Sequence, residues 1–352
     1  MGRGGKPPLI VTLKDVARQA GVSPATASLV LNGKPGIKAS TRIKVQEAAK
    51  TLGYTPNGMA QSLVTSKSHT IGLIVTDIEN PFFASLTRYI DQSIRSYEYG
   101  LILSISNDDI ETEDRILQDF MRKRVEGVVV VPSFAKRSDF RIYETLEKRG
   151  IPFIFATSYY LDFGRRCVMT NLAKGSYLLV KYLLDLGHRS IVFLLSSDLS
   201  VALSSFRLQG YRQAFQEKGV PVDESLIVPC VRPDYHCAYQ TANSVLKSRK
   251  VDAMITINDY MALGAKRAAE ELGYRIPEDV SIAGYDDVTF ASLSEIPLTT
   301  VRQPIGTIGM DSVDQLFASM EGKHAGPEIL FVEPELIVRQ STGHVTAART
   351  GA

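Results

Sequence analysis

The sequence is poor in cysteine and histidine and contains no tryptophan: three cysteines and five histidines occur in 352 residues. Cys167, Cys230 and Cys237 are odd in number and lack the paired spacing of zinc ligands, so we expect neither a disulfide framework nor a metal site. We interpret them as reduced thiols, most simply buried as small hydrophobic side chains. Such cysteine usage is typical of a cytoplasmic protein.

Long hydrophobic runs are absent too. No segment approaches the ~18–20 uninterrupted apolar residues that span a bilayer. The first eight residues, Met-Gly-Arg-Gly-Gly-Lys-Pro-Pro, lack the apolar core of a signal peptide. The sequence therefore predicts a protein with no membrane partner.

The motifs of common enzymes are also missing. The chain has no glycine-rich phosphate loop, no His-Glu-x-x-His and no Gly-x-Ser-x-Gly. The carboxylate pairs Asp108-Asp109 and Asp286-Asp287 are adjacent in sequence, so their side chains point apart rather than converging on one substrate atom. We expect no catalytic residue, no cofactor and no metal.

What the chain does contain, near its start, is the pattern of a helix-turn-helix. Thr12 can cap a first helix, with Asp15 returning the bond as a capping box. Gly21 ends that helix, Ser23 caps a second one, and Pro24 occupies its first turn, where a missing N–H is harmless. Two short helices joined by a glycine-containing turn present the second helix outward, in the geometry that enters the DNA major groove.

Charge is distributed in a way that supports DNA binding. Residues 1–68 hold ten Lys and Arg against two Asp and Glu. The whole chain has 40 against 38, so the remainder has 30 against 36. A basic N-terminal part attached to an acidic body is what a polyanion-binding module requires.

Further motifs occur along nearly the whole chain. In order they are Thr12 to Ser23, Val30-Leu31-Asn32, Leu52-Gly53-Tyr54-Thr55-Pro56-Asn57, Asn80-Pro81-Phe82-Phe83, Leu186-Gly187-His188-Arg189, Arg207-Leu208-Gln209-Gly210-Tyr211, Asn258-Asp259-Tyr260-Met261-Ala262-Leu263-Gly264-Ala265, Gly284-Tyr285-Asp286-Asp287 and Arg302-Gln303-Pro304. With these motifs the chain resembles the lactose/galactose-repressor (LacI/GalR) family of bacterial transcription factors.

The expected fold is α/β. A third helix of the N-terminal domain is predicted from Ser40 to Gly53, with Ile43, Val45, Ala48 and Ala49 inward. From Thr70 onward, apolar runs alternate with helix-length segments, which predicts doubly wound parallel sheets covered on both faces. The runs are Ile71–Val75, Leu101–Ile105, Val128–Val131, Phe153–Phe155, Ile191–Leu195, Ala253–Ile257 and Val280–Ala283. The resemblance implies two lobes of the periplasmic-binding-protein type, with three crossovers and a cleft between them.

Domain boundaries follow from these patterns and from the resemblance. We expect a flexible basic arm at 1–10, a three-helix helix-turn-helix domain at 11–55, a hinge helix and linker at 56–68, an effector-binding and dimerisation core at 69–345 and a tail at 346–352. Lobe 1 is expected at about 69–169 and 299–329, and lobe 2 at about 170–298 and 330–345.

The resemblance implies a set of DNA-binding residues, with a recognition helix from about Pro24 to Leu31. They are Thr12, Lys14, Ser23, Pro24, Ala25, Thr26, Ser28, Leu29, Asn32, Asn57, Ala60 and Leu63. Thr26 and Ser28 can bond a phosphate or a base edge, whereas Ala25 and Leu29 offer only apolar contact, for example with a thymine methyl. Many relatives carry an Arg or another polar residue at the Leu29 position, and the alternative for Leu29 is a place in the core.

The resemblance also implies that Leu63, on the hinge helix, is wedged into the minor groove at the operator centre. The alternative is that it packs on the partner chain. Gly58 costs that helix roughly 1 kcal/mol relative to Ala. We therefore expect the hinge to be disordered off DNA and to fold when two copies meet on an operator.

Six effector-binding residues are implied in the same way: Phe82, Phe83, Thr157, Arg207, Asn258 and Asp286. The aromatic rings can stack on a sugar or base, and Arg207 can fork onto hydroxyl, carboxylate or phosphate oxygens. Many relatives have Asp where Thr157 stands, so no relative's effector is carried over. The alternatives are a structural Asp286–Arg207 ion pair and a core position for Phe82.

We therefore expect a homodimeric, sequence-specific transcriptional regulator, in the first place a repressor. It would bind a pseudo-palindromic double-stranded operator and respond to a small-molecule effector, a sugar or nucleoside-like metabolite. One alternative is a pure solute-binding receptor with the two-lobe fold. Another is an activator, or a regulator that uses a corepressor protein.

Overall fold

The computed structural model describes residues 11–54, 67–164, 166–196, 202–323 and 328–345. Contacts divide the chain into two compact units between Ser68 and His69, named here the head and the core. No helix in the described ranges is both long and apolar enough to cross a membrane.

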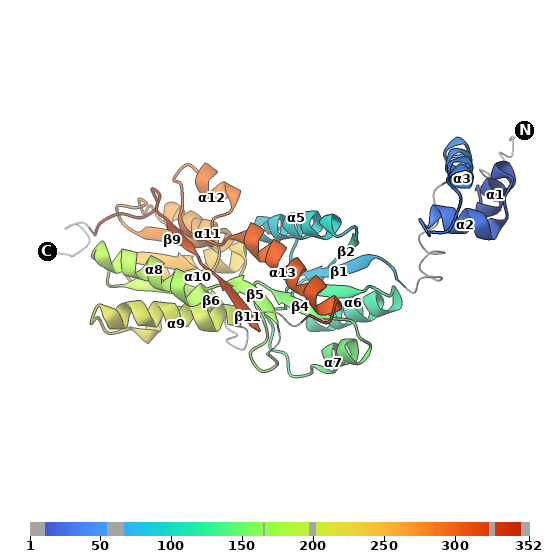
Figure 1. Cartoon of the computed structure of the whole chain (residues 1–352). Coiled ribbons are helices and arrows are strands. Elements are labelled where there is room, and N and C mark those ends of the chain that lie inside the picture. The colour runs from blue at the N-terminus through green and yellow to red at the C-terminus, as the bar shows by residue number, and fades with distance from the viewer. Residues whose placement is uncertain (1–10, 55–66, 165, 197–201, 324–327, 346–352) are drawn as a thin grey trace, which may run out of the picture. The chain divides into compact units, whose positions relative to one another are not determined.

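The head contains the three predicted helices, α1 (Leu13–Ala20), α2 (Pro24–Leu31) and α3 (Ala39–Leu52) (Figure 1). The backbone N–H and the hydroxyl of Thr12 donate to the Asp15 carboxylate at 3.0 and 2.6 Å. These bonds hold the pKa of Asp15 below its usual value. Gly21 ends α1 with a φ of 64°, and Ser23 Oγ accepts the Thr26 N–H at 3.1 Å. The predicted helix-turn-helix is confirmed.

The core of the head is small and mostly aliphatic. Its buried side chains are Val16, Ala17, Ala27, Val30, Val45, Ala48 and Ala49. The prediction that Ile43 faces inward is wrong, because this side chain is 55% exposed. On α3 the inward face repeats at Val45 and Ala48, and a residue two positions before Val45 lies on the opposite side of the helix.

Two parallel sheets form the core unit, as predicted. The first sheet has the strand order β11-β5-β4-β3-β1-β2 and is parallel throughout. Its strands are β1 (Thr70–Val75), β2 (Gly100–Ile105), β3 (Gly127–Val130), β4 (Phe153–Ala156), β5 (Cys167–Thr170) and β11 (Ile329–Val332). Its helices are α5 (Pro81–Ser96), α6 (Ile110–Arg122), α7 (Arg141–Lys148) and α13 (Ile305–Met320).

The second sheet has the order β12-β10-β9-β8-β6-β7, with β12 antiparallel to β10 at one edge. Its strands are β6 (Ile191–Ser196), β7 (Ile227–Cys230), β8 (Ala253–Thr256), β9 (Ser281–Asp286), β10 (Thr299–Arg302) and β12 (Glu335–Ile337). Its helices are α8 (Leu172–Asp185), α9 (Ala202–Glu217), α10 (Tyr235–Ser248), α11 (Asp259–Glu271) and α12 (Thr289–Leu293), with a short 3-10 turn at Glu224–Leu226.

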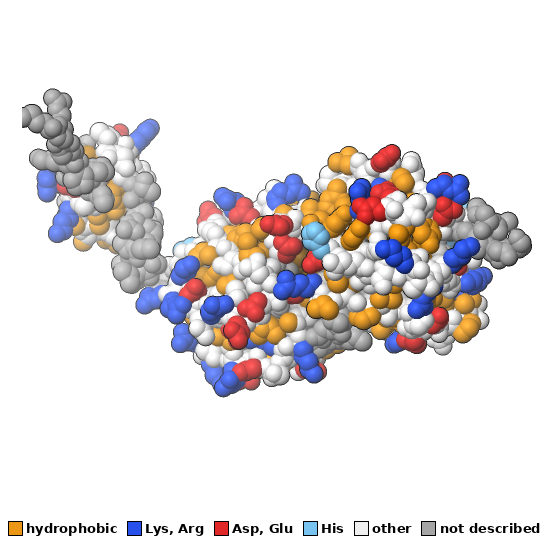
Figure 2. Space-filling view, turned by 180° about the vertical axis from the view of Figure 1, so that it is seen from behind, with side chains coloured by type: hydrophobic (Ala, Val, Ile, Leu, Met, Phe, Trp, Pro, Cys, Tyr) orange, Lys and Arg blue, Asp and Glu red, His pale blue; other side chains and the backbone are white. Residues whose placement is uncertain are grey.

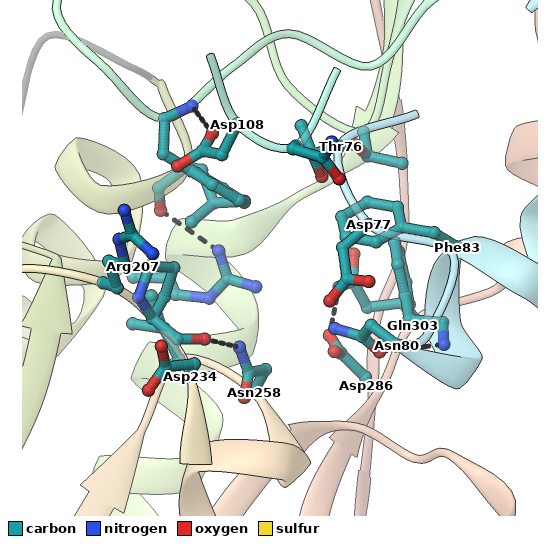
Figure 3. A pocket seen from close by; sticks show the side chains of 18 of the residues that line it. Thr76, Asp77, Asn80, Phe83, Asp108, Arg207, Asp234, Asn258, Asp286 and Gln303 are labelled. Carbon is teal, nitrogen blue, oxygen red and sulfur yellow. Dashed lines mark hydrogen bonds between the residues drawn. The ribbon is translucent and has the colours of Figure 1, made fainter. Parts of the chain in front are cut away.

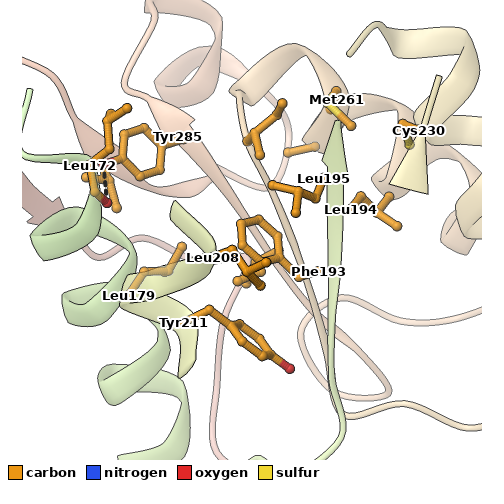
Figure 4. Close-up of a cluster of buried hydrophobic side chains, with 14 of the residues drawn as sticks. Leu172, Leu179, Phe193, Leu194, Leu195, Leu208, Tyr211, Cys230, Met261 and Tyr285 are labelled. Carbon is orange, nitrogen blue, oxygen red and sulfur yellow. Dashed lines mark hydrogen bonds between the residues drawn. The ribbon is translucent and has the colours of Figure 1, made fainter. Parts of the chain in front are cut away.

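Strand β1 illustrates why the apolar runs are continuous rather than alternating. Ile71, Leu73 and Val75 join the hydrophobic cluster that includes α5 and α13. Ile74, between them, joins the cluster on the other face with α6. Both faces of a parallel strand are covered, so every position is apolar. The second sheet is filled in the same way by side chains such as Phe193, whose ring stacks on Tyr211 at 5.5 Å (Figure 4).

The chain passes between the sheets three times, and strand pairing corrects two of the expected boundaries. The first crossing, after Thr170, lies where it was expected. Thr299–Arg302 pairs in the second sheet, so the second crossing follows Arg302 instead of occurring near Thr299. Ile329–Val332 pairs in the first sheet, so the last crossing follows Val332 rather than occurring near Leu330. β10 and β11 have only four residues each, and neither was recognised as a strand in the sequence, so nothing local marked these two boundaries.

Helices α8 and α9 pack closely because Gly210 has no side chain. A Cβ built there would lie 2.0 Å from the Ala173 carbonyl oxygen, which is backbone and cannot rotate away. We expect Gly210→Ala to force the helices apart and to lower the free energy of unfolding by ~1–3 kcal/mol. Urea denaturation measures this, with Gln209→Ala on the exposed side of the same helix as the control. Equal stability of both variants would contradict the close-packing role.

Candidate functional site

A cavity of about 330 Å³ lies at the carboxyl ends of the strands of both sheets. Crevices at this edge are where doubly wound α/β folds bind ligands. Its lining comes from both lobes and from the second crossing: Thr76, Asp77, Asn80, Phe82, Phe83, Asn107, Asp108, Asp109, Phe134, Thr157, Leu203, Arg207, Arg232, Pro233, Asp234, Ile257, Asn258, Asp286 and Gln303. In Figure 3, Arg207, Asp234 and Asn258 lie on one side of the cavity, and Asp77, Asn80 and Phe83 on the other.

All six of the predicted effector-binding residues line this one cavity. They come from α5 for the two phenylalanines, from the end of β4 for Thr157, from α9 for Arg207, from the end of β8 for Asn258 and from the end of β9 for Asp286. The fold thus places at one cavity predicted residues that are more than 200 positions apart in the sequence. Their contact with an effector stays a prediction.

Arg207 is buried, with 1% of its surface exposed. Its guanidinium lies over the Tyr285 ring at 4.1 Å from the centroid, and Nη1 donates to the Leu203 carbonyl at 3.2 Å. Its Nε has no hydrogen-bond partner among the described residues. Burial lowers the pKa of Arg207, while Tyr285 and Asp286 oppose that shift. A buried, incompletely paired donor beside a cavity is placed to bind an oxygen atom of a ligand.

Asp286 belongs to a hydrogen-bonded chain that reaches both lobes. Gln303 Nε2 donates to Asp286 Oδ1 at 2.6 Å, and Thr170 Oγ1 donates to Gln303 Oε1 at 2.6 Å. All three side chains are buried. Burial raises the pKa of Asp286 to about 7, against the opposing effects of Arg207 and the Gln303 bond. Thr170 ends a strand of the first sheet, so the chain of bonds ties the first crossing to the second and to the cavity.

A second buried carboxylate, Asp259, lies near enough to Asp286 to feel its charge. It accepts hydrogen bonds from Thr300 Oγ1 at 2.6 Å and from the Val288 N–H at 2.9 Å. Burial raises its pKa well above the usual value, and the charge of Asp286 adds to the shift. Asp259 does not line the cavity, so its role is to hold the β9–α12 connection in place.

Two of the predicted residues have structural duties as well. Asn258 caps α11 by accepting the Met261 N–H at 2.7 Å, and its Nδ2 donates to the Pro233 carbonyl at 3.1 Å. Phe82 and Phe83 are buried, contact each other edge to face at 5.2 Å, and belong to a hydrophobic cluster of the first lobe. Each phenylalanine therefore serves the core and the cavity wall together, so the core alternative for Phe82 and its place in the cavity wall both hold.

Backbone strain gathers at the cavity. Four non-glycine residues that line it have positive φ angles: Asn107 at 52°, Asp108 at 59°, Thr157 at 68° and Asp286 at 113°. Such conformations cost about 1–3 kcal/mol each and concentrate at functional sites. For Thr157, whose β-branched side chain disfavours positive φ, the strain is a signal that the residue type alone does not carry.

Sequence reasoning gave no role to several lining residues. They are Thr76, Asp77, Asn80, Asn107, Asp108, Phe134, Arg232, Asp234 and Gln303. Asp108 accepts from Ser133 Oγ at 2.9 Å, and burial raises its pKa. Asn80 and Asp234 cap α5 and α10. For most of them the sequence carried a signal of position, since they follow a predicted strand or, like Asn80 and Gln303, belong to a quoted motif. Arg232 and Asp234 carried none, because they follow β7, a strand that was not predicted.

The cavity wall carries more carboxylates than cations. Five aspartates line it, namely Asp77, Asp108, Asp109, Asp234 and Asp286, against the two arginines Arg207 and Arg232. Among the residues that the structure covers, no group of three or more His, Cys, Asp or Glu could hold a metal ion. The wall is thus rich in hydrogen-bond acceptors with a few strong donors, and three phenylalanine rings complete it.

The head presents the predicted DNA-binding residues at its surface. Thr12, Lys14, Ser23, Pro24, Ala25, Leu29 and Asn32 are exposed, and Thr26 and Ser28 are partly exposed. Leu29 is 44% exposed, so it does not belong to the core of the head. Asn57, Ala60 and Leu63 lie outside the described residues, as do the basic arm, most of the hinge segment and the tail. Their roles stay predictions.

Charge differs between the two units as the sequence indicated. The visible face of the head carries Lys and Arg side chains with few Asp or Glu, whereas both signs are interspersed on the core (Figure 2). In protein–DNA complexes, contacts of Lys and Arg with the phosphate backbone set affinity but carry no sequence information.

Comparison with known proteins matches both the head and the core to known domains. Residues 12–57 match "Bacterial regulatory proteins, lacI family", and residues 180–342 match "Periplasmic binding protein-like domain". The transcriptional regulator DegA of Bacillus subtilis is 31% identical over 94% of this chain and 98% of its own. The ribose operon repressor of Haemophilus influenzae is 32% identical over the same shares.

A solved structure of the lac repressor dimer, bound to operator and the anti-inducer ONPF, has a TM-score of 0.82 and 27% identity, covering 95% of this chain and 99% of that one. These relatives are transcriptional regulators rather than enzymes. The similarity to these relatives includes both the helix-turn-helix head and the two-lobed core, since it covers nearly the full length of each chain. The chain therefore belongs to the lacI family of bacterial regulatory proteins and is a DNA-binding transcriptional regulator, not an enzyme.

Proposed function

We propose that the protein is a repressor that binds a pseudo-palindromic operator as a homodimer and is controlled by a neutral, polyhydroxylated effector in the interlobe cavity. The observation that carries this proposal is a single cavity lined from both lobes, in a chain that also carries a helix-turn-helix head. Two-fold symmetry of the dimer would impose the symmetry of the operator. Because its target is chromosomal DNA, we assign the protein to the bacterial cytoplasm.

The chemistry of the wall favours a sugar. A hydroxyl group both donates and accepts, so a polyol can satisfy carboxylates such as Asp108 and Asp286 and also a donor such as Arg207. The Phe83 and Phe134 rings offer an apolar surface to a pyranose or furanose face. Five carboxylates facing two guanidiniums disfavour a phosphorylated ligand, because the wall has no cluster of cations to offset a phosphate. The name of the ribose operon repressor is in keeping with a sugar effector.

Control would act through the relative position of the lobes. An effector that contacts both lobes stabilises the closed arrangement over the open one, and the three crossings are where the backbone adjusts. To move the equilibrium from 1:99 to 99:1, the effector must favour one arrangement by ~5.5 kcal/mol. This difference would come from contacts with Arg207 and Asp286 of the second lobe and with Asp108 and Phe83 of the first lobe.

The first experiment is retention of genomic DNA. Fragments of the genome that encodes the chain are passed over the purified protein at ~150 mM salt, which weakens nonspecific binding, and retained fragments are sequenced. Recovery of a pseudo-palindrome supports the repressor, and sugars are then tested for its release. The retention is repeated with a cell extract that can supply a corepressor protein. If no sequence is preferentially retained in either case, only the solute-receptor alternative is left.

Two head variants separate affinity from specificity on the recovered operator. We expect Lys14→Ala to weaken binding to every sequence alike and to reduce the log–log salt slope by about one, because one phosphate contact is lost. Leu29→Ala replaces one uncharged side chain by another, so the log–log salt slope should stay the same. Discrimination at one base pair should fall, because an apolar contact with a base is lost. Filter binding at several salt concentrations measures both. A Leu29 variant with unchanged discrimination would contradict its place on the base-reading surface.

A further inference from the structure

Two of the three cysteines flank, in the sequence, a group of residues that line the cavity. Cys230 is the last residue of β7 and is fully buried, while Cys237 is the third residue of α10 and is partly exposed. Between them runs a short connection that contains Arg232, Pro233 and Asp234, all of which line the cavity. A part of the cavity wall therefore lies between the two cysteines in the sequence.

The side chain of Cys230 already reaches the helix that carries Cys237. Its Sγ donates to Thr241 Oγ1 at 3.7 Å. Thr241 lies four residues after Cys237 on α10, hence on the same face, where Cβ atoms are ~5–6 Å apart. Cys237 packs against the hydrophobic cluster to which Cys230 belongs.

The Cys237 side chain is near enough to influence the Cys230 thiol. Burial raises the pKa of the Cys230 thiol to about 12, the Thr241 bond acts in the opposite direction, and the neighbouring Cys237 raises it further. Cys230 is thus held as a neutral thiol away from solvent, whereas the partly exposed Cys237 is the one that a small oxidant can reach.

The connection between the cysteines is coupled to the cavity by hydrogen bonds. The Cys237 N–H donates to Asp234 Oδ1 at 2.8 Å and so forms the cap of α10. The Pro233 carbonyl accepts from Asn258 Nδ2, which joins the connection to α11. Any change that draws Cys237 toward Cys230 moves three lining residues together.

We propose that Cys230 and Cys237 form a peroxide-sensitive dithiol that reshapes the effector cavity when it is oxidised to a disulfide. Cys237 Sγ attacks hydrogen peroxide: an S–O bond forms, the O–O bond breaks, and water leaves, giving a sulfenic acid. Cys230 Sγ then attacks Cys237 Sγ: the S–S bond forms, the S–O bond breaks, and the Cys230 proton leaves with the oxygen as a second water. The two sulfurs together give up two electrons to the peroxide. This inference is independent of the identity of effector and operator.

The test uses the full-length protein treated with hydrogen peroxide, alkylated in denaturant and digested with a protease that cleaves before aspartate. Cleavage at Asp234 separates the two cysteines, so a disulfide between them appears as two linked peptides by mass spectrometry. We expect that link in the wild type and its complete loss in Cys237→Ser. Cys167→Ser is the matched control, since Cys167 is buried in β5 of the other lobe and its Sγ donates to the Ser158 carbonyl, with no cysteine among its described contacts.

Hydrogen exchange of the oxidised protein supplies the second readout. We expect altered exchange at residues 231–237 and 258–261 in the wild type and in Cys167→Ser, and none in Cys237→Ser, which replaces one sulfur by oxygen at a partly exposed position. The proposal is overturned if Cys237 proceeds to sulfinic acid without a link, if the link joins two copies of the chain, or if the disulfide forms with no change in exchange at these residues.

Discussion

Replacing Arg207 by alanine is expected to abolish the release of the operator by the effector and to leave operator affinity unchanged. The guanidinium is buried beside the cavity, has an unpaired Nε among the described residues and stacks on Tyr285. A ligand oxygen that pairs with it removes the cost of a buried donor, so the bond is stronger in the ligand-bound state. The head is a separate compact unit, which is why DNA binding should not suffer. Titration of the recovered operator complex with the identified sugar measures the effect.

Two further variants make the Arg207 result interpretable. Arg212→Ala removes an arginine from the same helix whose exposed side chain pairs with Glu224 at 2.8 Å, and it should respond normally. Arg207→Lys keeps a charge but not the fork of donors, so it should retain only a weakened response. A normal response in Arg207→Ala would show that the effector binds elsewhere.

Replacing Asp286 by asparagine is expected to stabilise the core at neutral pH and to impair the effector response. The folded-state pKa is raised to about 7 from 3.8, chiefly by burial. Between these values the folded protein binds a proton that the unfolded chain has lost, so stability decreases as pH rises through this window and is constant above it. At about 1.4 kcal/mol per pKa unit, the ionised carboxylate lowers the free energy of unfolding by up to about 4 kcal/mol above pH 7.

Asparagine removes that penalty and keeps the oxygen that accepts the Gln303 N–H. Urea denaturation at pH 5 and pH 8 should show a smaller difference between the two pH values in the variant than in the wild type. Some dependence should remain, because the pKa of Asp259 is also raised and acts with the same sign. A variant that is less stable than the wild type at pH 8 would contradict the assignment. A gain in stability with a loss of response is the usual relation at a binding site.

The helix-turn-helix could be predicted residue by residue because its signals are local. The Thr12–Asp15 capping box, the left-handed Gly21 and the Ser23 cap each act within four residues of chain. The seven apolar runs are likewise strands in the structure. Six of them are buried strands, which read as continuous hydrophobic sequence, whereas β2 is an edge strand that is partly exposed. Ile43 was misplaced because the surface of a small head exposes some apolar side chains.

The strands that sequence reasoning missed are short or lie at sheet edges. β7, β11 and β12 are edge strands whose residues are mostly only partly buried, and β7 contains Pro229. β10 is central but reads Thr-Thr-Val-Arg, because its threonines bond to Asp259 and Thr342 inside the lobe. Hydrogen bonding to distant residues is not visible in a local pattern, and this explains the displaced boundary at the second crossing.

The contrast between local sequence signals and contacts of distant residues also explains which cavity residues could be predicted. Residues within family motifs, such as Arg207 and Asp286, could be assigned because the resemblance supplied their position. Asp108 and Arg232 could not, since they lie in connections whose conformation depends on the packing of other segments. Gln303 was quoted in a motif, yet its link between Thr170 and Asp286 emerges only when the two crossings are brought together.

The last strand of the first sheet has a consequence for biosynthesis. β11 (Ile329–Val332) pairs with β5, but it is translated after every strand of the second sheet except β12. While the ribosome makes the second lobe, the Cys167–Thr170 strand therefore has an open edge, which is a surface on which unpaired strands of other nascent chains can dock. Neither lobe is a contiguous stretch of chain. A gene fusion that exchanges effector specificity between such regulators must therefore transfer both lobes together, with its junction between the head and His69.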